Sequence, residues 1–341
     1  MLRHVLLVLT MLSATLFAGG TSADTAGPLS IPPRDGWQST MLTDHPLVGR
    51  IWLPGEKRFG TVENLRALAR SADYLLLGEK HTNADHHRLQ ADLLGERLAT
   101  GARPGLVWEM LTTDQSGLLQ TYLSSDGATA AGFGPAVGWS DSGWPDWTIY
   151  QPIAETALPA GLPQAAGNLP RDVSRSIVMS GADALPSTML RQVIDQTRWD
   201  AADRAALAQE MVEGHCNMLP ESMVPGMSLV QRARDGAMAL AMVQAATADG
   251  TVLIAGGGHT RLDRGVPRYL EVLLQDQQPA PTVVAIAMME VEPDETDPAA
   301  YVAQLSTDSD NVVPLSDAII FTPRLDLNDP CEKLRLRHGK Q

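Results

Sequence analysis

Three short apolar segments of the sequence each end on an acidic residue or a histidine. They read YLLLGEKH from residue 74, LVWE from residue 106 and TVLIAGGGH from residue 251, so they end in Glu79, His81, Glu109 and His259. Apolar runs of this length, bounded by glycine and polar residues, are typical of buried strands. Ligands bind open α/β sheets where the carboxyl ends of parallel strands meet. If the three strands are parallel neighbours, we expect the four side chains to line one pocket.

Two carboxylates and two imidazoles support two kinds of chemistry. In a metal site, Glu79, His81 and His259 would be ligands of a divalent cation. In a hydrolase, Glu79, His81, Glu109 and His259 would be catalytic, with a histidine as general base or metal ligand and Glu79 activating water. Each motif also has a plain structural reading, because residues 78–81 suit a helix-capping loop and residues 256–258 suit a tight turn.

Glu109 directly follows an apolar strand and therefore needs a partner. A buried carboxylate without one costs several kcal/mol or shifts its pKa. Arg171, Arg261 or a metal could supply the positive charge, and a purely structural salt bridge is an equally good reading. The sequence contains no dinucleotide-binding glycine motif, no phosphate-binding loop, no His-Glu-x-x-His helix and no Gly-x-Ser-x-Gly elbow, so the enzyme classes built on those motifs are not indicated.

The order of apolar segments predicts an α/β fold, with a mainly parallel β-sheet flanked by helices. We expect a long loop over residues 124–146 and a helical insertion or subdomain at about residues 185–248. The predicted strands are 74–77, 106–108, 162–166, 251–255, 282–288 and an edge strand at 317–322; the predicted helices include 61–71, 84–99, 110–123, 150–157 and 266–275.

The N-terminus has the pattern of an export signal: a basic start, an apolar stretch over residues 5–17 and small residues up to Ala23. We expect a signal peptide at 1–23, a linker at 24–44, the α/β domain at 45–325 and a C-terminal tail at 326–341. No cysteine follows the apolar stretch to carry a lipid, and no later segment is apolar for about 18 residues. The sequence therefore predicts a periplasmic or secreted protein without a membrane span.

The charge and the cysteines narrow the partners further. A net charge of −14 argues against binding nucleic acid or an anionic membrane. Cys216 and Cys331 are the only cysteines, and in an exported protein such a pair favours a disulfide. The alternative is that Cys216, beside His215, binds a metal or haem. Tyr150, next to the predicted long loop, is the tyrosine best placed to contact a ligand, although a core position is the commoner role.

Taken together, these pieces resemble the ChaN-like haem-binding uptake proteins, which are related to Tiki proteases and erythromycin esterases. The resemblance covers about residues 45–325. It rests on these segments in this order: LLGEKH from residue 76 with His87 and Gln90, VWEM from 107, YQPI from 150, GNLPR from 167, His215-Cys216, QRARDGAM from 231 and AGGGH from 255.

This resemblance implies haem binding at the cell envelope, a tyrosine ligand to the iron and haem-mediated homodimers. The candidate cofactor-binding residues are Tyr150, His87, Arg171 and His259. In related enzymes, catalytic or metal-binding glutamates and histidines occupy the strand ends held here by Glu79, His81, Glu109 and His259. Unlike some members, this chain lacks the cysteine for a lipid anchor.

Three functions remain open at this stage. The first is a periplasmic protein that binds haem or iron and serves uptake. The second is a hydrolase of ester or peptide substrates that uses the Glu79/His81/Glu109/His259 pocket, with or without a divalent metal. The third is a binding module for another small molecule.

Overall fold

The computed structural model describes residues 29–33, 35–302, 313–328, 331–332 and 335. The predicted signal peptide at 1–23 lies outside these residues, as do part of the predicted linker and most of the predicted tail. Every helix within the described ranges is either too short or too polar to cross a lipid bilayer.

Within the described residues, one eight-stranded sheet runs through the molecule in the order β2-β1-β8-β7-β3-β6-β4-β5. The strands from β8 to β5 in this order are parallel, and β1 pairs antiparallel with β8 and with β2. The predicted α/β fold with a mainly parallel sheet is therefore confirmed. The strands are β1 (Ile51–Leu53), β2 (Arg58–Gly60), β3 (Tyr74–Glu79), β4 (Gly105–Thr112), β5 (Gln164–Asn168), β6 (Thr251–Gly256), β7 (Val283–Glu290) and β8 (Ala318–Thr322).

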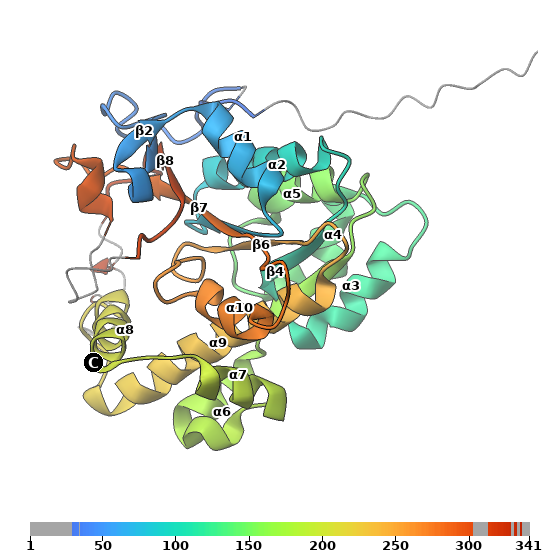
Figure 1. Cartoon of the computed structure of the whole chain (residues 1–341), viewed down its shortest axis with the longest axis vertical. Coiled ribbons are helices and arrows are strands. Elements are labelled where there is room, and N and C mark those ends of the chain that lie inside the picture. The colour runs from blue at the N-terminus through green and yellow to red at the C-terminus, as the bar shows by residue number, and fades with distance from the viewer. Residues whose placement is uncertain (1–28, 34, 303–312, 329–330, 333–334, 336–341) are drawn as a thin grey trace, which may run out of the picture.

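Strand β3 shows why the apolar runs are continuous rather than alternating. Its side chains point to opposite faces in turn, and Leu75 and Leu77 enter one hydrophobic cluster while Tyr74 and Leu76 enter another. Helices cover both faces of the sheet (Figure 1), so a central parallel strand is apolar on both sides.

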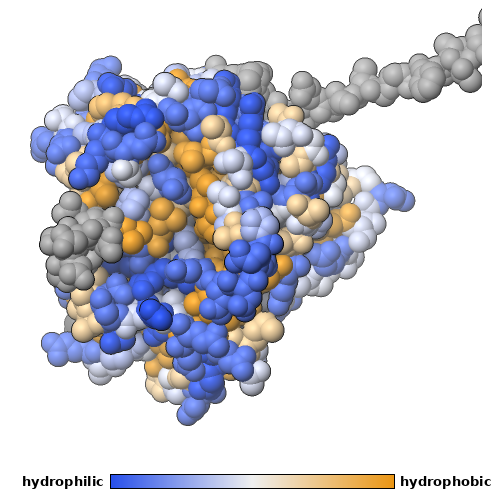
Figure 2. All heavy atoms as spheres, in the orientation of Figure 1, coloured by the Kyte–Doolittle hydropathy of each residue, from blue (hydrophilic) through white to orange (hydrophobic). Residues whose placement is uncertain are grey.

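The helices form a layer on each face of the sheet, and on the face shown in Figure 2 apolar residues come to the surface between the mostly hydrophilic upper and lower parts of the molecule. The first layer includes α1 (Val62–Ser71), α2 (Ala84–Leu98) and α5 (Trp147–Ala157), and the second includes α7 (Thr188–Gln196), α9 (Val224–Ala245) and α10 (Val266–Leu274). The others are α3 (Ser116–Leu123), α4 (Ala130–Ala136), α6 (Arg171–Ser180) and α8 (Ala201–Gly214). Within the predicted helical insertion, α9 shares its core with β3, β4 and β6, so it closes one face of the sheet.

The predicted loop at 124–146 is wrong in part, because it contains helix α4 and a short 3-10 turn over Trp139–Asp141. Phe133 stacks on Trp147 with ring centroids 5.0 Å apart, and Trp139 meets Trp147 edge-on at 4.7 Å. This aromatic packing stabilises a segment whose glycine and serine content suggests irregular structure. Two further boundaries differ: residues 110–112 belong to β4 rather than to a helix, and β8 lies between β1 and β7 rather than at the sheet edge.

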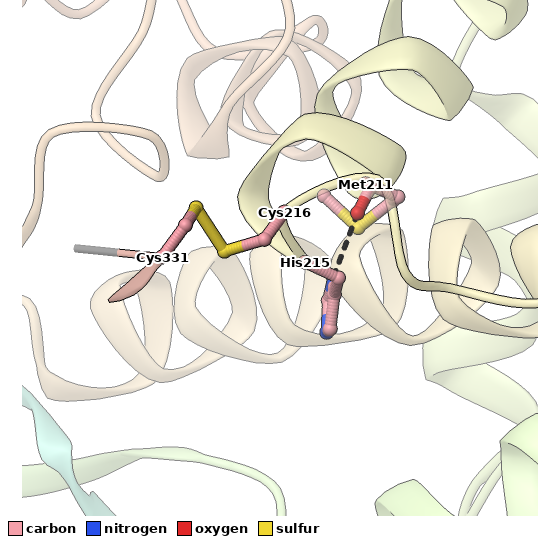
Figure 3. The surroundings of a disulfide bond; sticks show 4 residues. All are labelled: Met211, His215, Cys216 and Cys331. Atoms are coloured by element: carbon pink, nitrogen blue, oxygen red, sulfur yellow. Dashed lines mark hydrogen bonds between the residues drawn. A yellow bond between two sulfur atoms is a disulfide. The ribbon is translucent and has the colours of Figure 1, made fainter. Parts of the chain in front are cut away.

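The predicted disulfide is present and joins Cys216, just after α8, to Cys331 near the C-terminus (Figure 3). The alternative role of Cys216 as a metal or haem ligand is therefore excluded. His215 instead places its Nδ1 2.7 Å from the carbonyl oxygen of Met211, one helical turn earlier. Closing a loop of 115 residues restricts the unfolded chain and stabilises the fold, by about 2–4 kcal/mol for a typical disulfide.

Candidate functional site

The three strands that carry the predicted site residues are parallel neighbours. Strand β6 lies between β3 and β4, and its register places Gly256 beside Glu79. Glu79, Glu109 and the loop that leads to His259 therefore meet at the carboxyl edge of the sheet, where ligands bind in this class of fold. The predicted convergence of Glu79, His81, Glu109 and His259 is seen in the structure.

Glu79 and His81 form the first of two carboxylate–imidazole groups. The His81 Nδ1 lies 2.6 Å from Glu79 Oε1, and its Nε2 lies 3.9 Å from Glu109 Oε1, beyond hydrogen-bond distance. The side chain of His81 is 35 % exposed, whereas that of Glu79 is fully buried. Glu79 Oε2 is also buried and has no hydrogen-bond partner among the described residues. The first group therefore combines an oriented imidazole with a carboxylate oxygen that can still accept a hydrogen bond.

Gly256 makes room for this imidazole. A Cβ at residue 256 would lie 2.9 Å from His81 Cε1 and 3.0 Å from His81 Nε2, distances that side chains do not tolerate. The first glycine of the Gly-Gly-Gly run is thus explained by the close approach of the His81 ring, rather than by binding of a phosphate.

Glu109, His259 and Asp235 form the second group, and all three are buried. The His259 Nδ1 lies 2.6 Å from Asp235 Oδ1, and its Nε2 lies 3.3 Å from Glu109 Oε1. The other oxygen of Glu109 accepts a hydrogen bond of 2.6 Å from the backbone N–H of Gly256. The amide nitrogen of Gln231 lies 3.1 Å from His259 Nδ1. A single imidazole is thus held between two carboxylates.

The charges of the second group follow from this arrangement. Burial alone would lower the pKa of His259, but Glu109 and Asp235 favour the imidazolium and raise it to about 10. Burial alone would raise the pKa of Glu109, but His259 lowers it to about 2. Burial raises the pKa of Asp235 to about 6 against the attraction of His259. Hence His259 is a buried cation at neutral pH rather than a free general base.

His81 is in a different electrostatic position. Burial of the ring opposes its charged form, but the hydrogen bond that His81 donates to Glu79 and the charges of Glu79 and Glu109 outweigh this, so the pKa of His81 is raised. Its partial exposure leaves water access to the ring. Of the two histidines, His81 is the one whose proton can exchange with a ligand or with solvent.

Tyr150 and His87 lie behind the first group. The Tyr150 hydroxyl is fully buried, donates to the His81 carbonyl oxygen at 3.2 Å and lies 3.5 Å from Glu79 Oε1. The His87 ring packs on the Tyr150 ring at a centroid distance of 3.7 Å. Burial and the nearby Glu79 raise the pKa of Tyr150, and burial lowers the pKa of His87. Both residues hold the turn over 78–81 in place, and neither presents a ligand atom to the surface.

A cavity of about 600 Å³ opens beside the site, at the ends of β4 and β5. Its volume is in the range of small-molecule sites. Trp144 lines it and meets the His81 ring edge-on, with centroids 4.6 Å apart. The other residues around it are Met110, Thr112, Asp114, Gln115, Gly138, Asp141, Ser142, Gly143, Asn168, Leu169, Pro170, Arg171, Asp172 and Arg234.

The predicted arginine partners of Glu109 are wrong. Arg171 donates to the Ser142 carbonyl oxygen in the wall of the cavity, and Arg261 forms an ion pair of 2.5 Å with Asp263. The charge that balances Glu109 comes from His259, because β4 and β6 are neighbouring strands and the loop after β6 brings His259 Nε2 to 3.3 Å from Glu109 Oε1. In the described ranges, no group of three or more acidic, histidine or cysteine side chains is arranged to hold a metal ion.

Four residues of this region, Gln231, Asp235, Trp144 and Arg234, had no role predicted from the sequence, although three of them lie in the segment QRARDGAM on which the family resemblance partly rests. Gln231 and Asp235 are four apart on α9 and therefore share one face of the helix, which is the only local signal for their pairing with His259. Trp144 lies in the segment predicted to be a loop. Nothing in the sequence indicates that α9 passes close to the end of β6.

The chain is similar to a known protein family and to several solved structures. A sequence model described as haem-binding uptake, Tiki superfamily, ChaN matches residues 65–270, more than half of the chain. A solved structure of ChaN from Campylobacter jejuni with cofacially bound haem is similar, with 20 % identity and a TM-score of 0.60, covering 79 % of this chain and 95 % of that one. At this identity the likeness shows the fold alone.

Other solved structures are less similar to this chain than the ChaN structure is. A mutant of the erythromycin esterase EreC matches with 14 % identity and a TM-score of 0.34, covering 82 % of this chain and 83 % of that one. This similarity is too low to support a functional argument. No relative was found among curated protein sequences. On the match over residues 65–270, the chain belongs to the ChaN family of haem-binding uptake proteins in the Tiki superfamily.

Proposed function

We propose that this protein binds haem outside the cytoplasm and serves haem or iron uptake. The observation that carries the proposal is the family match over residues 65–270. The N-terminal signal pattern supports the location. The cavity beside His81 supports the choice of haem as the ligand, because it combines an aromatic wall at Trp144 with the guanidinium groups of Arg171 and Arg234. A planar apolar ring bearing carboxylates needs both kinds of contact.

Tyr150 is not well placed as the iron ligand in this proposal. A tyrosine ligates haem iron through its phenolate, and the pKa of Tyr150 is raised by burial and by Glu79. Its hydroxyl also faces the protein interior. The ring of His87 is also fully buried, so it is not well placed as the iron ligand either. The residues at the cavity surface are therefore the better candidates for contact with haem.

Haem titration of the purified mature chain, followed by absorbance, tests this function. We expect a saturable Soret band that differs from free haem and reaches a defined stoichiometry. Size-exclusion chromatography with and without haem tests the accompanying proposal that haem brings two copies together. A titration with no spectral change at micromolar protein would contradict haem binding, whatever the oligomeric state.

The Glu79–His81 group favours a second candidate function, hydrolysis of an ester or a peptide. Glu79 orients the imidazole through Nδ1 at 2.6 Å, and His81 Nε2 has no hydrogen-bond partner in the described structure. An imidazole held in this way can act as a general base toward water. The neighbouring cation of His259 would stabilise negative charge that develops nearby.

Small chromogenic esters and peptides, assayed with protein purified without chelators, test the hydrolase. Elemental analysis of the same sample shows whether a divalent metal is bound. We expect turnover to disappear in folded His81→Ala and Glu79→Ala variants. Turnover at the wild-type level in both variants would exclude this mechanism.

A further inference from the structure

Arg234 is a cation of α9 that lies in the wall of the cavity. Its Nε is buried and has no hydrogen-bond partner within the part of the chain that the structure describes. Among the described residues, Arg234 also forms no ion pair, whereas Arg232 on the same helix donates to the Ile194 carbonyl oxygen at 3.0 Å. A guanidinium has five N–H groups and cannot lose its charge in a protein. A half-buried arginine without a protein partner therefore leaves N–H groups available to an anion in the cavity.

A second guanidinium reaches the same cavity from α6. Arg171 contacts the loop at Ser142 and Gly143, where a Cβ on Gly143 would lie 2.9 Å from Arg171 Nη2. Gly143 has a φ of +82°, a conformation that glycine adopts without strain. The contact with Ser142 satisfies part of the fork of Arg171 and leaves further N–H groups for a ligand.

The acidic residues around the cavity do not neutralise these cations. Asp114, Asp141 and Asp172 are exposed, so water screens their charges. No ion pair joins any of them to Arg171 or Arg234 in the described structure. Trp144 lies between the cavity and the Glu79–His81 group. Its Nε1 donates to the Met110 carbonyl oxygen at 2.8 Å, and its ring contacts His81.

We propose that Arg234, assisted by Arg171, binds a carboxylate of the ligand in this cavity, with the apolar body of the ligand against Trp144. This inference rests on the proposed function, under which the carboxylates are the two propionates of haem. Arginine is suited to the task because its planar fork binds a carboxylate through two parallel hydrogen bonds. Lysine offers a point charge without that fork.

The decisive comparison uses Arg234→Gln, Arg234→Lys and the control Arg175→Gln, titrated with haem and with haem dimethyl ester. Arg175 is exposed on α6, so its replacement removes the same charge outside the cavity. We expect Arg234→Gln to bind haem about 10- to 100-fold more weakly, as for the loss of a hydrogen-bonded charge pair. We expect Arg234→Lys to be intermediate and Arg175→Gln to match the wild type.

Haem dimethyl ester, which lacks the free carboxylates, should bind the wild type and Arg234→Gln equally. Thermal melts of the variants without ligand show whether they are folded. Haem affinity of folded Arg234→Gln equal to that of the wild type would overturn the carboxylate site and leave the proposed haem function standing.

Metal-free protoporphyrin IX, followed by quenching of tryptophan fluorescence, separates the two proposals. If the wild type gives no haem spectrum but binds the porphyrin, and Arg234→Gln loses that binding, the carboxylate site stands without the haem function. If neither haem nor the porphyrin binds, both proposals fail.

Discussion

The two carboxylate–imidazole groups lie at the same edge of the sheet but differ in their access to water. His81 is paired with one carboxylate and is 35 % exposed. His259 is held between two carboxylates and is almost completely buried. The same residue types therefore give an imidazole that can exchange its proton in one group and a fixed internal cation in the other. Burial and the number of carboxylate partners decide the role, rather than the residue type.

The largest difference between the groups should appear when each histidine is replaced by glutamine. His259→Gln leaves Glu109 and Asp235 facing each other in the interior without a cation. We expect a loss of about 3–5 kcal/mol in the free energy of unfolding, as when one partner of a buried ion pair is removed. Denaturant unfolding of the wild type and the variant measures it.

His81→Gln is the matched control. Water can reach Glu79 through the space left at the mouth of the site, and the Tyr150 hydroxyl still lies 3.5 Å from Glu79 Oε1. We expect a loss of about 1 kcal/mol, as for one hydrogen bond. Equal losses in the two variants would show that burial does not distinguish the two groups.

The second group should also control how stability depends on pH. The pKa of His259 is raised to about 10 in the folded chain, so its contribution is complete below the unfolded value of about 6.5. That contribution is lost as pH rises from there through about 10. Asp235, with its pKa raised to about 6, acts in the same direction between about pH 4 and 6.

Glu109 acts in the opposite direction, because its pKa is lowered to about 2 and its contribution to stability disappears as pH falls below about 4.5.

Because only His259 titrates at higher pH in this group, we expect the Tm of the wild type to fall between pH 6.5 and 10. We expect that fall to be much smaller in His259→Gln. Thermal melts across this range measure both. Parallel curves for the two proteins would contradict a charged His259 at neutral pH.

The sequence predicts the first group better than the second for a physical reason. Glu79 and His81 are two residues apart at a strand end, and Glu109 and His259 also follow apolar strands, so parallel pairing alone brings the four together. Asp235 comes from a helix, and its place depends on how α9 crosses the sheet. Periodicity shows which face of α9 is apolar, but it does not show which strand end that helix passes.

The same reasoning explains the errors in the fold. Trp144 contacts His81 from a segment that lies between Trp139 and Trp147, whose rings pack edge-on against each other. Strand β8 is internal because the hairpin β1–β2, from the start of the domain, pairs with its outer edge. Both features depend on contacts between distant segments, which local composition does not reveal.

A spectroscopic test separates the two imidazoles more finely. In Glu79→Gln the amide oxygen can still accept a hydrogen bond from His81, but His81 loses the negative charge that raises its pKa. We therefore expect the pKa of His81 to fall toward or below the ordinary histidine value of about 6.5. His259 should stay protonated through neutral pH in the same sample, because its carboxylates are unchanged. NMR titration of the histidine ring protons follows both. A shift of His259 as large as that of His81 would mean that the two groups titrate as one unit.

The smallest expected effect concerns Tyr150, which the family resemblance suggests as a haem ligand and the geometry places in the interior. In Tyr150→Phe the ring still packs on His87, and the His81 carbonyl still lies 3.2 Å from His87 Nε2. The cost should therefore be about 1 kcal/mol, that of one hydrogen bond. The Soret band of the haem complex should be unchanged. Tyr122→Phe is the matched control, because that hydroxyl donates to the Thr129 carbonyl oxygen at 2.8 Å, away from the two groups. If Tyr150→Phe alone loses the band, the phenol ligates iron, and haem must then bind by opening the turn that carries Glu79 and His81.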